Sequence, residues 1–218
     1  MKKSEIDRLG ERLRVAVNAA DLTLLDTYRR EFQFSYESVA ARLQAALGIE
    51  VSGRPAKSTP AIVDKLRRSS MRLSQMQDVA GCRIVVSGIA EQNQLCSKIC
   101  ALFDAALFDR RTTPSHGYRA IHLVVRNFPH PVEIQLRTSL QHAWAGLSEK
   151  SADVFDSALK YGGGPEEVRN KLDELSAVIA GFEGSIEPVA MWSDIAQGLK
   201  KNLHDKISDV TARLGAAS

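Results

Sequence analysis

The sequence predicts an α+β fold in which a mixed β-sheet core is flanked by helices, with helical extensions at both ends. Two neighbouring segments, Gly117–Arg126 and Val132–Thr138, alternate apolar and polar side chains with a period of two, which is typical of half-buried strands. A third segment, Cys82–Val86, is short and apolar, as expected of a buried strand. In residues 1–47 and 194–214, apolar side chains recur instead at helical spacing.

Length and composition are those of an ordinary globular protein. The chain has 218 residues, is 44% hydrophobic and 25% charged, and carries a formal net charge of +3. We expect a single domain with N-terminal helices at residues 1–48, a core at 49–150 and a C-terminal helical extension at 151–218. The small positive excess is compatible with nucleotide or RNA ligands.

The compartment can be predicted from three features. No apolar run is long enough to span a membrane, and the charged start MKKSEIDRLGERLR lacks the apolar stretch of a secretory signal. The chain has an odd number of cysteines, namely Cys82, Cys96 and Cys100. No histidine stands at metal-ligand spacing from them. We therefore expect a cytoplasmic protein with reduced, mostly buried thiols, no zinc site and no membrane partner.

Two helices are predicted before the core. The first carries one apolar stripe, composed of Ile6, Leu9, Leu13 and Val17. The second is predicted to begin near Asp21, as its N-cap, and to run to Leu47, where Gly48 is a natural stop. Its core-facing candidates are Leu25, Tyr28, Phe32, Tyr36, Val39 and Leu43.

Further helices are predicted around the strands. After a loop, VSGRPAKS, Ser58 or Thr59 can cap a helix with Pro60 in its first turn. Residues 90–106 are predicted to be helical and are followed by a short segment at 107–111. Ser139 is predicted to cap the helix that follows the second alternating segment.

The C-terminal part is predicted to hold two helices, at about 165–182 and 188–214, after a break at Gly162–Gly164 and Pro165. The last helix is amphipathic, with a stripe of Ile195, Leu199, Leu203, Ile207, Val210 and Leu214. Packing against the core of the same chain is the first interpretation of this stripe. Contact with another subunit or a partner protein is the second.

The two alternating segments are joined by NFPHP, a turn-rich linker that predicts a hairpin. Alternation places Glu133, Gln135 and Arg137 on one face of the second strand, and Tyr118 and His122 on one face of the first. An ordinary solvated strand face remains possible, but such faces usually carry Lys, Thr, Glu and Ser. This one offers groups that stack on bases, bind metal and bind phosphate.

The motifs GYRAIH and VEIQLRT, with DVAGCRIVV upstream, resemble the synthetase domain of the RelA/SpoT alarmone synthetases over about residues 28–150. The resemblance implies a nucleotidyltransferase-like core and an ATP- and Mg²⁺-dependent pyrophosphokinase. It would move a pyrophosphate group from ATP to the ribose 3′-hydroxyl of GDP or GTP. The first 50 residues contain no histidine for a hydrolase metal site, so we expect synthesis only, as in the small alarmone synthetases.

Two carboxylates match the acidic positions of that family. Magnesium takes hard oxygen ligands, commonly one or two carboxylates plus phosphate oxygens. The resemblance assigns Asp78 to the metal, and Glu133 to the metal and to polarising the acceptor hydroxyl. The structural alternatives are a turn cap for Asp78 and a salt bridge with Arg119 or Arg137 for Glu133.

Basic residues of the loop and helix at 53–68 match the family's ATP-binding segment, and one further arginine lies in the apolar strand. The predicted ATP-binding residues are Arg54, Lys57, Lys65, Arg68 and Arg83. Lys65 and Arg68 are i,i+3 neighbours on a helix and can address one ligand. The alternatives are a solvated basic helix face and, for Arg83, an ion pair with Asp78 or Glu133.

The acceptor nucleotide is assigned to the hairpin and its surroundings. By resemblance, the base stacks on Tyr118 and His122 lies near the acceptor phosphates. The full set of predicted acceptor residues is Tyr118, His122, Gln135, Arg137, His142, Arg110 and Arg111. A core tyrosine, a structural histidine and solvated loop arginines are the alternatives.

The segment SLQHAWAGLSEK departs from the family, because many of its members have asparagine where this chain has His142. In this respect the chain is similar to the toxic small synthetases of toxin–antitoxin pairs, some of which pyrophosphorylate the 3′-CCA end of tRNA while others make adenosine alarmones. A tRNA acceptor and an antitoxin partner therefore stay open, as does a homo-oligomer. A non-catalytic nucleotide-binding module is a further alternative.

Overall fold

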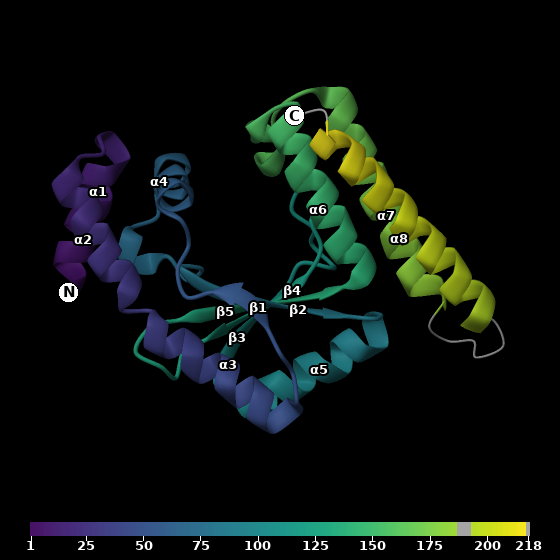
Figure 1. Ribbon diagram of the computed structural model, residues 1–218, viewed down its shortest axis with the longest axis horizontal. Helices are drawn as coiled ribbons and strands as arrows, with labels where there is room; N and C mark the ends of the chain where they lie inside the picture. The colour runs from purple at the N-terminus through teal and green to yellow at the C-terminus, as the bar shows by residue number, and fades with distance from the viewer. Residues whose placement is uncertain (187–192, 217–218) are drawn as a thin grey trace. The chain divides into compact units, whose positions relative to one another are not determined.

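The computed structural model describes residues 1–186 and 193–216 and contains a five-stranded mixed sheet flanked by helices (Figure 1). The strands are β1 (Ser52–Arg54), β2 (Ala80–Val86), β3 (Ala105–Asp109), β4 (Ile121–Val125) and β5 (Val132–Thr138). Their order in the sheet is β1-β2-β5-β4-β3, and β1 pairs with β2 in antiparallel orientation. The predicted α+β fold with a mixed sheet is confirmed, and β4 and β5 are neighbours as expected.

The helices surround the strands in chain order. They are α1 (Lys3–Val15), α2 (Ala19–Arg30), α3 (Gln33–Leu47), α4 (Thr59–Arg68), α5 (Ile89–Leu102), α6 (Ser139–Val154), α7 (Glu166–Ile186) and α8 (Ser193–Ala216). Two short 3₁₀ helices are η1 (Leu73–Gln75) and η2 (Ser157–Tyr161). In the two described ranges, no helix combines the length and apolar character needed to cross a membrane.

The chain divides into two compact units. The first comprises Met1–Ile84, Ile99–Leu107 and Leu123–Gln135, and the second comprises Val85–Lys98, Phe108–His122 and Leu136–Ser218. The boundaries fall within strands, so that β5 contributes Glu133 and Gln135 to the first unit and Arg137 to the second. The division into three segments of one domain stays a prediction.

In the first unit, α1 buries Ile6, Leu9 and Leu13 and packs against α2 and α4. The predicted continuation of its stripe to Val17 is wrong, because α1 ends at Val15 and Val17 is exposed.

The second predicted helix is in fact two helices. Its N-cap is Asn18, whose side chain accepts a hydrogen bond from the Asp21 backbone N–H. Asp21 instead turns its carboxylate to Arg12, at 2.8 Å. The helix also breaks after Arg30, where the chain tightens and the Glu31 N–H donates to the Tyr28 carbonyl. Gly48 ends α3 in the left-handed conformation at φ 68°, as predicted.

Three predicted boundaries around the sheet are also corrected. The loop VSGRPAKS contains the short strand β1. The helix expected at 90–106 ends at Leu102, and β3 occupies its last residues. The first alternating segment begins as a loop, because Gly117 has a φ of 78° and β4 starts only at Ile121.

In the second unit, α6 is capped by Thr138 and not by Ser139. The Thr138 hydroxyl accepts from the Gln141 N–H at 3.1 Å, and the Gln141 side chain accepts from the Thr138 N–H at 3.2 Å, which together form a capping box. The core here joins three helices and consists of Leu140, Trp144, Ala145, Leu147, Leu172, Ile179 and Ile207.

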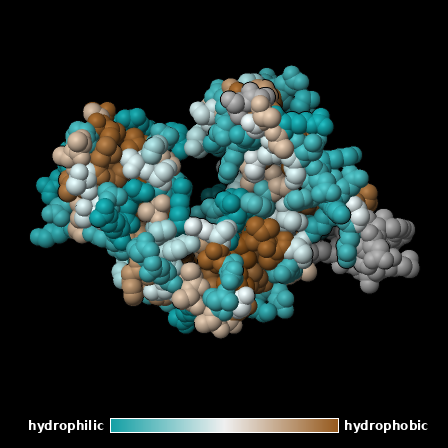
Figure 2. All heavy atoms as spheres, in the orientation of Figure 1, coloured by the Kyte–Doolittle hydropathy of each residue, from teal (hydrophilic) through white to brown (hydrophobic). Residues whose placement is uncertain are grey.

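The C-terminal stripe packs only in part against this core. Ile207 is buried, and Leu203 and Leu214 pack beside it, whereas Leu199 and Val210 are exposed. The predicted start of the last helix at 188–192, and the side chain of Ile195, lie outside the described residues. On the face shown in Figure 2, the surface over α8 is mainly hydrophilic, as expected of an amphipathic helix.

All three cysteines, each of them described, are free thiols. Cys82 in β2 is buried, Cys96 is half-buried and Cys100 is exposed, so the prediction of mostly buried thiols is wrong for Cys100. Burial, with the nearby Glu133 carboxylate, raises the pKa of the Cys82 thiol to about 12.

Candidate functional site

A carboxylate held between two ammonium groups is the centre of the first unit's candidate site. Asp78 Oδ2 lies 2.8 Å from Lys57 Nζ, and its Oδ1 lies 2.7 Å from Lys65 Nζ. Burial by itself would raise the pKa of Asp78, but the two ammonium groups outweigh it and hold that pKa below the usual range. Asp78 is therefore ionised at neutral pH, and the predicted turn-cap role does not account for its contacts.

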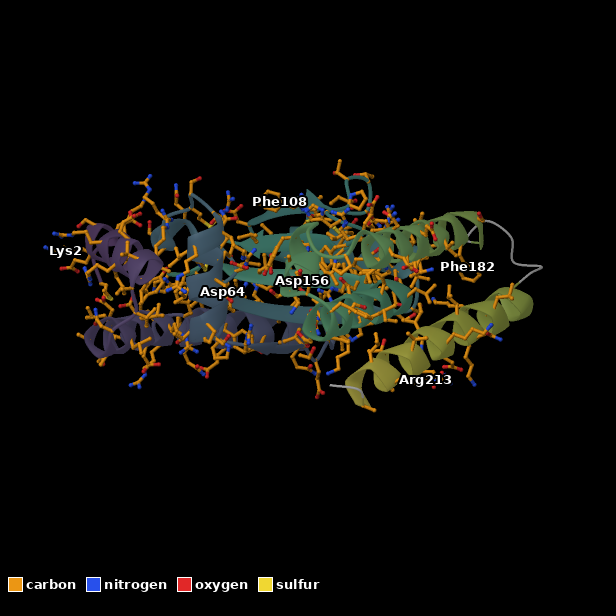
Figure 3. The ribbon with its side chains drawn as sticks, turned by 90° about the horizontal axis from the view of Figure 1, so that it is seen from above. Lys2, Asp64, Phe108, Asp156, Phe182 and Arg213 are labelled. Carbon is orange, nitrogen blue, oxygen red and sulfur yellow. The ribbon has the colours of Figure 1, made fainter. Side chains whose placement is uncertain are left out.

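The two lysines reach Asp78 from separate elements. Lys57 lies in the loop after β1, where its N–H donates to the Val79 carbonyl at 2.7 Å and its carbonyl accepts from Arg29 Nε at 2.9 Å. Lys65 lies on α4, which is amphipathic because Ile62, Val63 and Leu66 face the core. The opposite face of α4 carries exposed Asp64, labelled in Figure 3.

The other predicted ATP-binding residues differ in exposure. Arg54 at the end of β1 and Arg68 near the end of α4 are exposed, and Arg83 in β2 is half-buried. Lys57 and Lys65 thus both contact the Asp78 carboxylate. Arg54 and Arg68 lie at the surface of the same unit.

Glu133 and Gln135 lie on one face of β5, between buried Val132, Ile134 and Leu136. Gln135 Nε2 donates to Glu133 Oε2 at 2.8 Å. The alternative partner Arg119 directs its side chain elsewhere, to Ser176 and to the Arg111 carbonyl. Both predicted metal carboxylates belong to the first unit.

The donor chemistry fits magnesium that also uses phosphate oxygens. No cluster of three or more acidic, histidine or cysteine side chains capable of holding a metal occurs in residues 1–186 and 193–216. Magnesium, however, is commonly bound through only one or two carboxylates, with substrate phosphates and water filling its other positions. The ionised Asp78 and the carboxylate of Glu133 are donors of this kind.

In the second unit, Tyr118 contacts two other predicted acceptor residues, His122 and Arg137. The Tyr118 hydroxyl lies 3.0 Å from His122 Nε2 and accepts from Arg137 Nη2 at 2.9 Å. The Arg137 guanidinium also lies over the Tyr118 ring, 5.0 Å from its centroid. Arg137 is buried, whereas Tyr118 and His122 are half-buried. The structure therefore places a guanidinium over a tyrosine ring that lies 19 residues earlier in the sequence.

The two arginines before β4 have different environments. Arg111 forms an ion pair with Asp109, Nη2 to Oδ2 at 2.6 Å, and hydrogen bonds to Asn93 and Gln92. These contacts tie the Arg111 side chain to neighbouring residues of the fold, so the alternative interpretation of Arg111 as a solvated loop charge is wrong. Arg110 is exposed, and its N–H donates to the Ala120 carbonyl.

The remaining predicted acceptor residue, His142, is half-buried on α6. The partners of Arg111 were not anticipated. Asp109 stands two residues from Arg111 in the sequence FDRR, so this local pair could have been read from spacing. Gln92, in α5, offers no such signal.

The comparisons agree with this fold. Residues 53–152 match the family described as "Region found in RelA / SpoT proteins". An uncharacterized protein of Mycobacterium tuberculosis (strain ATCC 25618 / H37Rv) and one of Mycobacterium bovis are each 36% identical over 137 residues. The alignment covers 61% of this chain, and the chain spans about half the length of these curated relatives.

Two solved structures are similar to the chain. The small alarmone synthetase 1 from Bacillus subtilis matches with a TM-score of 0.61 and 22% identity, covering 81% of this chain and 98% of that chain. A GTP pyrophosphokinase family protein from Streptococcus pneumoniae matches with a TM-score of 0.56 and 20% identity, covering 84% and 97%. At these identities the likeness shows the fold.

Proposed function

We propose that this protein is an ATP-dependent pyrophosphotransferase, because residues 53–152 match the model of the RelA/SpoT region. The group transferred is the β,γ-pyrophosphate of ATP, and the acceptor is the ribose 3′-hydroxyl of GDP or GTP. The 3′-oxygen forms a bond to the β-phosphorus, the bond from that phosphorus to its bridging oxygen on the α-phosphate breaks, and AMP leaves with the electron pair.

The observation that carries the proposal is the Lys57–Asp78–Lys65 cluster. Two ammonium groups within 2.8 Å of one carboxylate form a compact set of charges suited to a metal–triphosphate complex. When ATP binds, the lysines exchange Asp78 for phosphate oxygens, and the carboxylate becomes available to the metal. Each charge keeps an opposite partner, so the exchange leaves no buried charge unpaired.

The remaining donor contacts follow from exposure and charge. Arg54 and Arg68 present guanidinium groups at the surface of the first unit, where they can reach adenine or phosphate. Arg83 is half-buried in β2, the neighbour of β5 in the sheet, and is assigned to phosphate.

Asp78 and Glu133 would hold Mg²⁺, which supplies neutralisation of phosphate charge and acidification of the acceptor hydroxyl when it is bound. Glu133 is the group to which the 3′-hydroxyl proton passes. Its hydrogen bond from Gln135 orients the carboxylate for this role.

The acceptor is assigned to the second unit. Its base stacks on the half-buried Tyr118 ring, and His122 and Arg110 address its phosphates. His142 on α6 completes the set in this unit, and the remaining assigned residue, Gln135, belongs to the first unit. The support for a guanosine acceptor is indirect: the Bacillus subtilis small alarmone synthetase 1 is described as bound to its product pppGpp.

The direct test is incubation of the purified protein with Mg²⁺ and ATP labelled at the γ-phosphate, with GDP, GTP, ATP and deacylated tRNA offered in parallel. Because the γ-phosphate travels with the transferred group, label on GDP or GTP supports the proposal. Label on tRNA alone, or on adenosine nucleotides alone, assigns the same chemistry to another acceptor. Binding of nucleotides without transfer to any acceptor would leave a non-catalytic module.

A further inference from the structure

Helix α7 contacts the segment that carries Tyr118, although α7 lies outside the RelA/SpoT region at residues 53–152. Ser176 on α7 is buried, with 3% of its surface exposed. Its hydroxyl donates to the Gly117 carbonyl at 2.5 Å and accepts from Arg119 Nε at 3.0 Å. One hydroxyl thus holds the residues on both sides of Tyr118.

Arg119 connects Ser176 to a second loop. Arg119 Nη1 donates to the carbonyl of Arg111, whose side chain pairs with Asp109. Ser176 is therefore linked through Arg119 to the loop that carries Arg110 and Arg111.

The turn at Gly117 packs closely against both α6 and α7. A Cβ at this position would lie 2.6 Å from Trp144 and 2.9 Å from Asp173 Oδ1, and the φ of 78° disfavours any side chain there. Trp144 is in turn tied to α7, because its Nε1 donates to the Leu172 carbonyl at 2.8 Å.

A second contact lies further along the same face of α7. Leu172, Ser176, Ile179 and Glu183 are all buried and recur at helical spacing. Glu183 follows Phe182, which Figure 3 labels, and its carboxylate accepts from the Thr138 hydroxyl and, at 3.1 Å, from Gln141 Nε2. Thr138 directly follows Arg137 in the chain.

We propose that Ser176 is a positioning residue for the acceptor site, holding Tyr118 in register through Gly117 and Arg119, with Glu183 bracing the Arg137 end. The inference rests on the proposed function, because Tyr118 is the assigned stacking platform. It makes α7 part of the acceptor site's support, beyond its contribution to packing.

The test compares Ser176→Ala with Ser185→Ala. Ser185 lies on the same helix but is exposed, and its hydroxyl donates only locally, to the Gly181 carbonyl. Loss of the Ser176 hydroxyl leaves the buried Gly117 carbonyl and the half-buried Arg119 Nε short of a partner, so we expect KM for GDP or GTP to rise roughly 10-fold. KM for ATP should change little, the unfolding temperature should fall by about a few degrees, and Ser185→Ala should match the wild type.

Two measurements separate positioning from general damage. Backbone hydrogen exchange at residues 117–119, measured without ligands, should accelerate in Ser176→Ala and not in Ser185→Ala. In an Arg119→Gln background, Ser176→Ala should add less than its single effect, because the Arg119–Ser176 bond is already lost while the bond to the Gly117 carbonyl remains. Arg119→Gln also tests the link if Ser176→Ala does not fold.

Unchanged acceptor KM and unchanged exchange in folded Ser176→Ala would overturn the proposal. Equal rises in both KM values would do the same, because they indicate general damage and not an effect on the acceptor site. If the wild-type protein transfers to no acceptor, the proposed function fails. The exchange comparison then still decides whether Ser176 holds the Tyr118 segment.

Discussion

The guanidinium of Arg137 lies over the ring of Tyr118, 5.0 Å from its centroid, and also donates to the Tyr118 hydroxyl at 2.9 Å. Tyr118 precedes β4 and Arg137 is near the end of β5, so the pair joins the two segments of the GYRAIH and VEIQLRT motifs. The guanidinium over the ring and the bond to the hydroxyl together fix the plane of the Tyr118 ring.

Two substitutions at Tyr118 separate its ring from its hydroxyl. Tyr118→Ala should raise KM for the guanosine acceptor about 5- to 150-fold, because stacking contributes about 1–3 kcal/mol per base. Tyr118→Phe keeps the ring and loses only the hydroxyl's bonds to His122 and Arg137, so its effect should be smaller. Steady-state kinetics with varied GDP will measure both. An equal effect on KM for ATP would argue against an acceptor role.

Removal of the proton-accepting carboxylate should abolish transfer without unfolding the protein. We expect Glu133→Gln to lower kcat by about 10²- to 10⁴-fold, the range of general acid–base contributions, with further loss if metal binding also fails. Glu149→Gln, an exposed glutamate on α6, is the matched control. Radiolabel transfer and circular dichroism will check the two expectations. A fully active Glu133→Gln protein would refute the assignment.

Asp78 should affect both activity and acid stability. Asp78→Asn should lower transfer by at least about 100-fold, because metal stabilisation of the transition state is worth several kcal/mol. Exposed Asp64→Asn is its control on α4. Because the folded pKa of Asp78 is lowered from 3.8, its ion pairs stabilise the fold fully above that pH. The stabilisation is lost as the pH falls below 3.8 and through the folded pKa.

We therefore expect the free energy of unfolding of Asp78→Asn at pH 7 to be about 1 kcal/mol lower than that of the wild type. The effect is small because both lysines are partly exposed. This difference should stay constant down to about pH 5 and shrink below 3.8. Urea denaturation across this range will measure it. A difference that grows on acidification would contradict the lowered pKa.

Gly117 and Gly146 should respond in opposite ways to alanine. Gly117→Ala meets Trp144 and a positive φ, and should destabilise the fold by about 2 kcal/mol or more. Gly146 lies within α6 with open space around its Cα, so Gly146→Ala should stabilise by about 0.5–1 kcal/mol. Thermal unfolding of both variants will check the signs. A neutral Gly117→Ala would show that the turn can relax.

The thiols should react in the order Cys100, Cys96, Cys82. Cys100 is exposed, whereas Cys82 is buried and its pKa is raised to about 12, so little thiolate forms there at pH 8. Timed alkylation with iodoacetamide followed by peptide mass spectrometry will measure the order. Early labelling of Cys82 in the folded protein would contradict its burial.

Local pattern accounts for much of what could be predicted. Alternation identified β5 at its full length, and the apolar run CRIVV identified most of β2. Gly48 and Pro60 marked helix ends as their backbone chemistry requires. The wrong predictions lie where one residue type suits two local structures. Asp21 is predicted as an N-cap, but its carboxylate forms an ion pair with Arg12, and Asn18 is the N-cap.

The sequence by itself determined the α+β class, the resemblance of its motifs to those of the RelA/SpoT family and the chemical types of the candidate site residues, because these depend on periodicity and on residues near in the chain. Tertiary structure decided which groups meet. Lys57 and Lys65 converge on Asp78 from different elements, and Arg137 covers Tyr118. Ser176 reaches the Gly117 turn from a helix far along the chain. Such contacts depend on how elements pack, and no spacing rule along one chain encodes them.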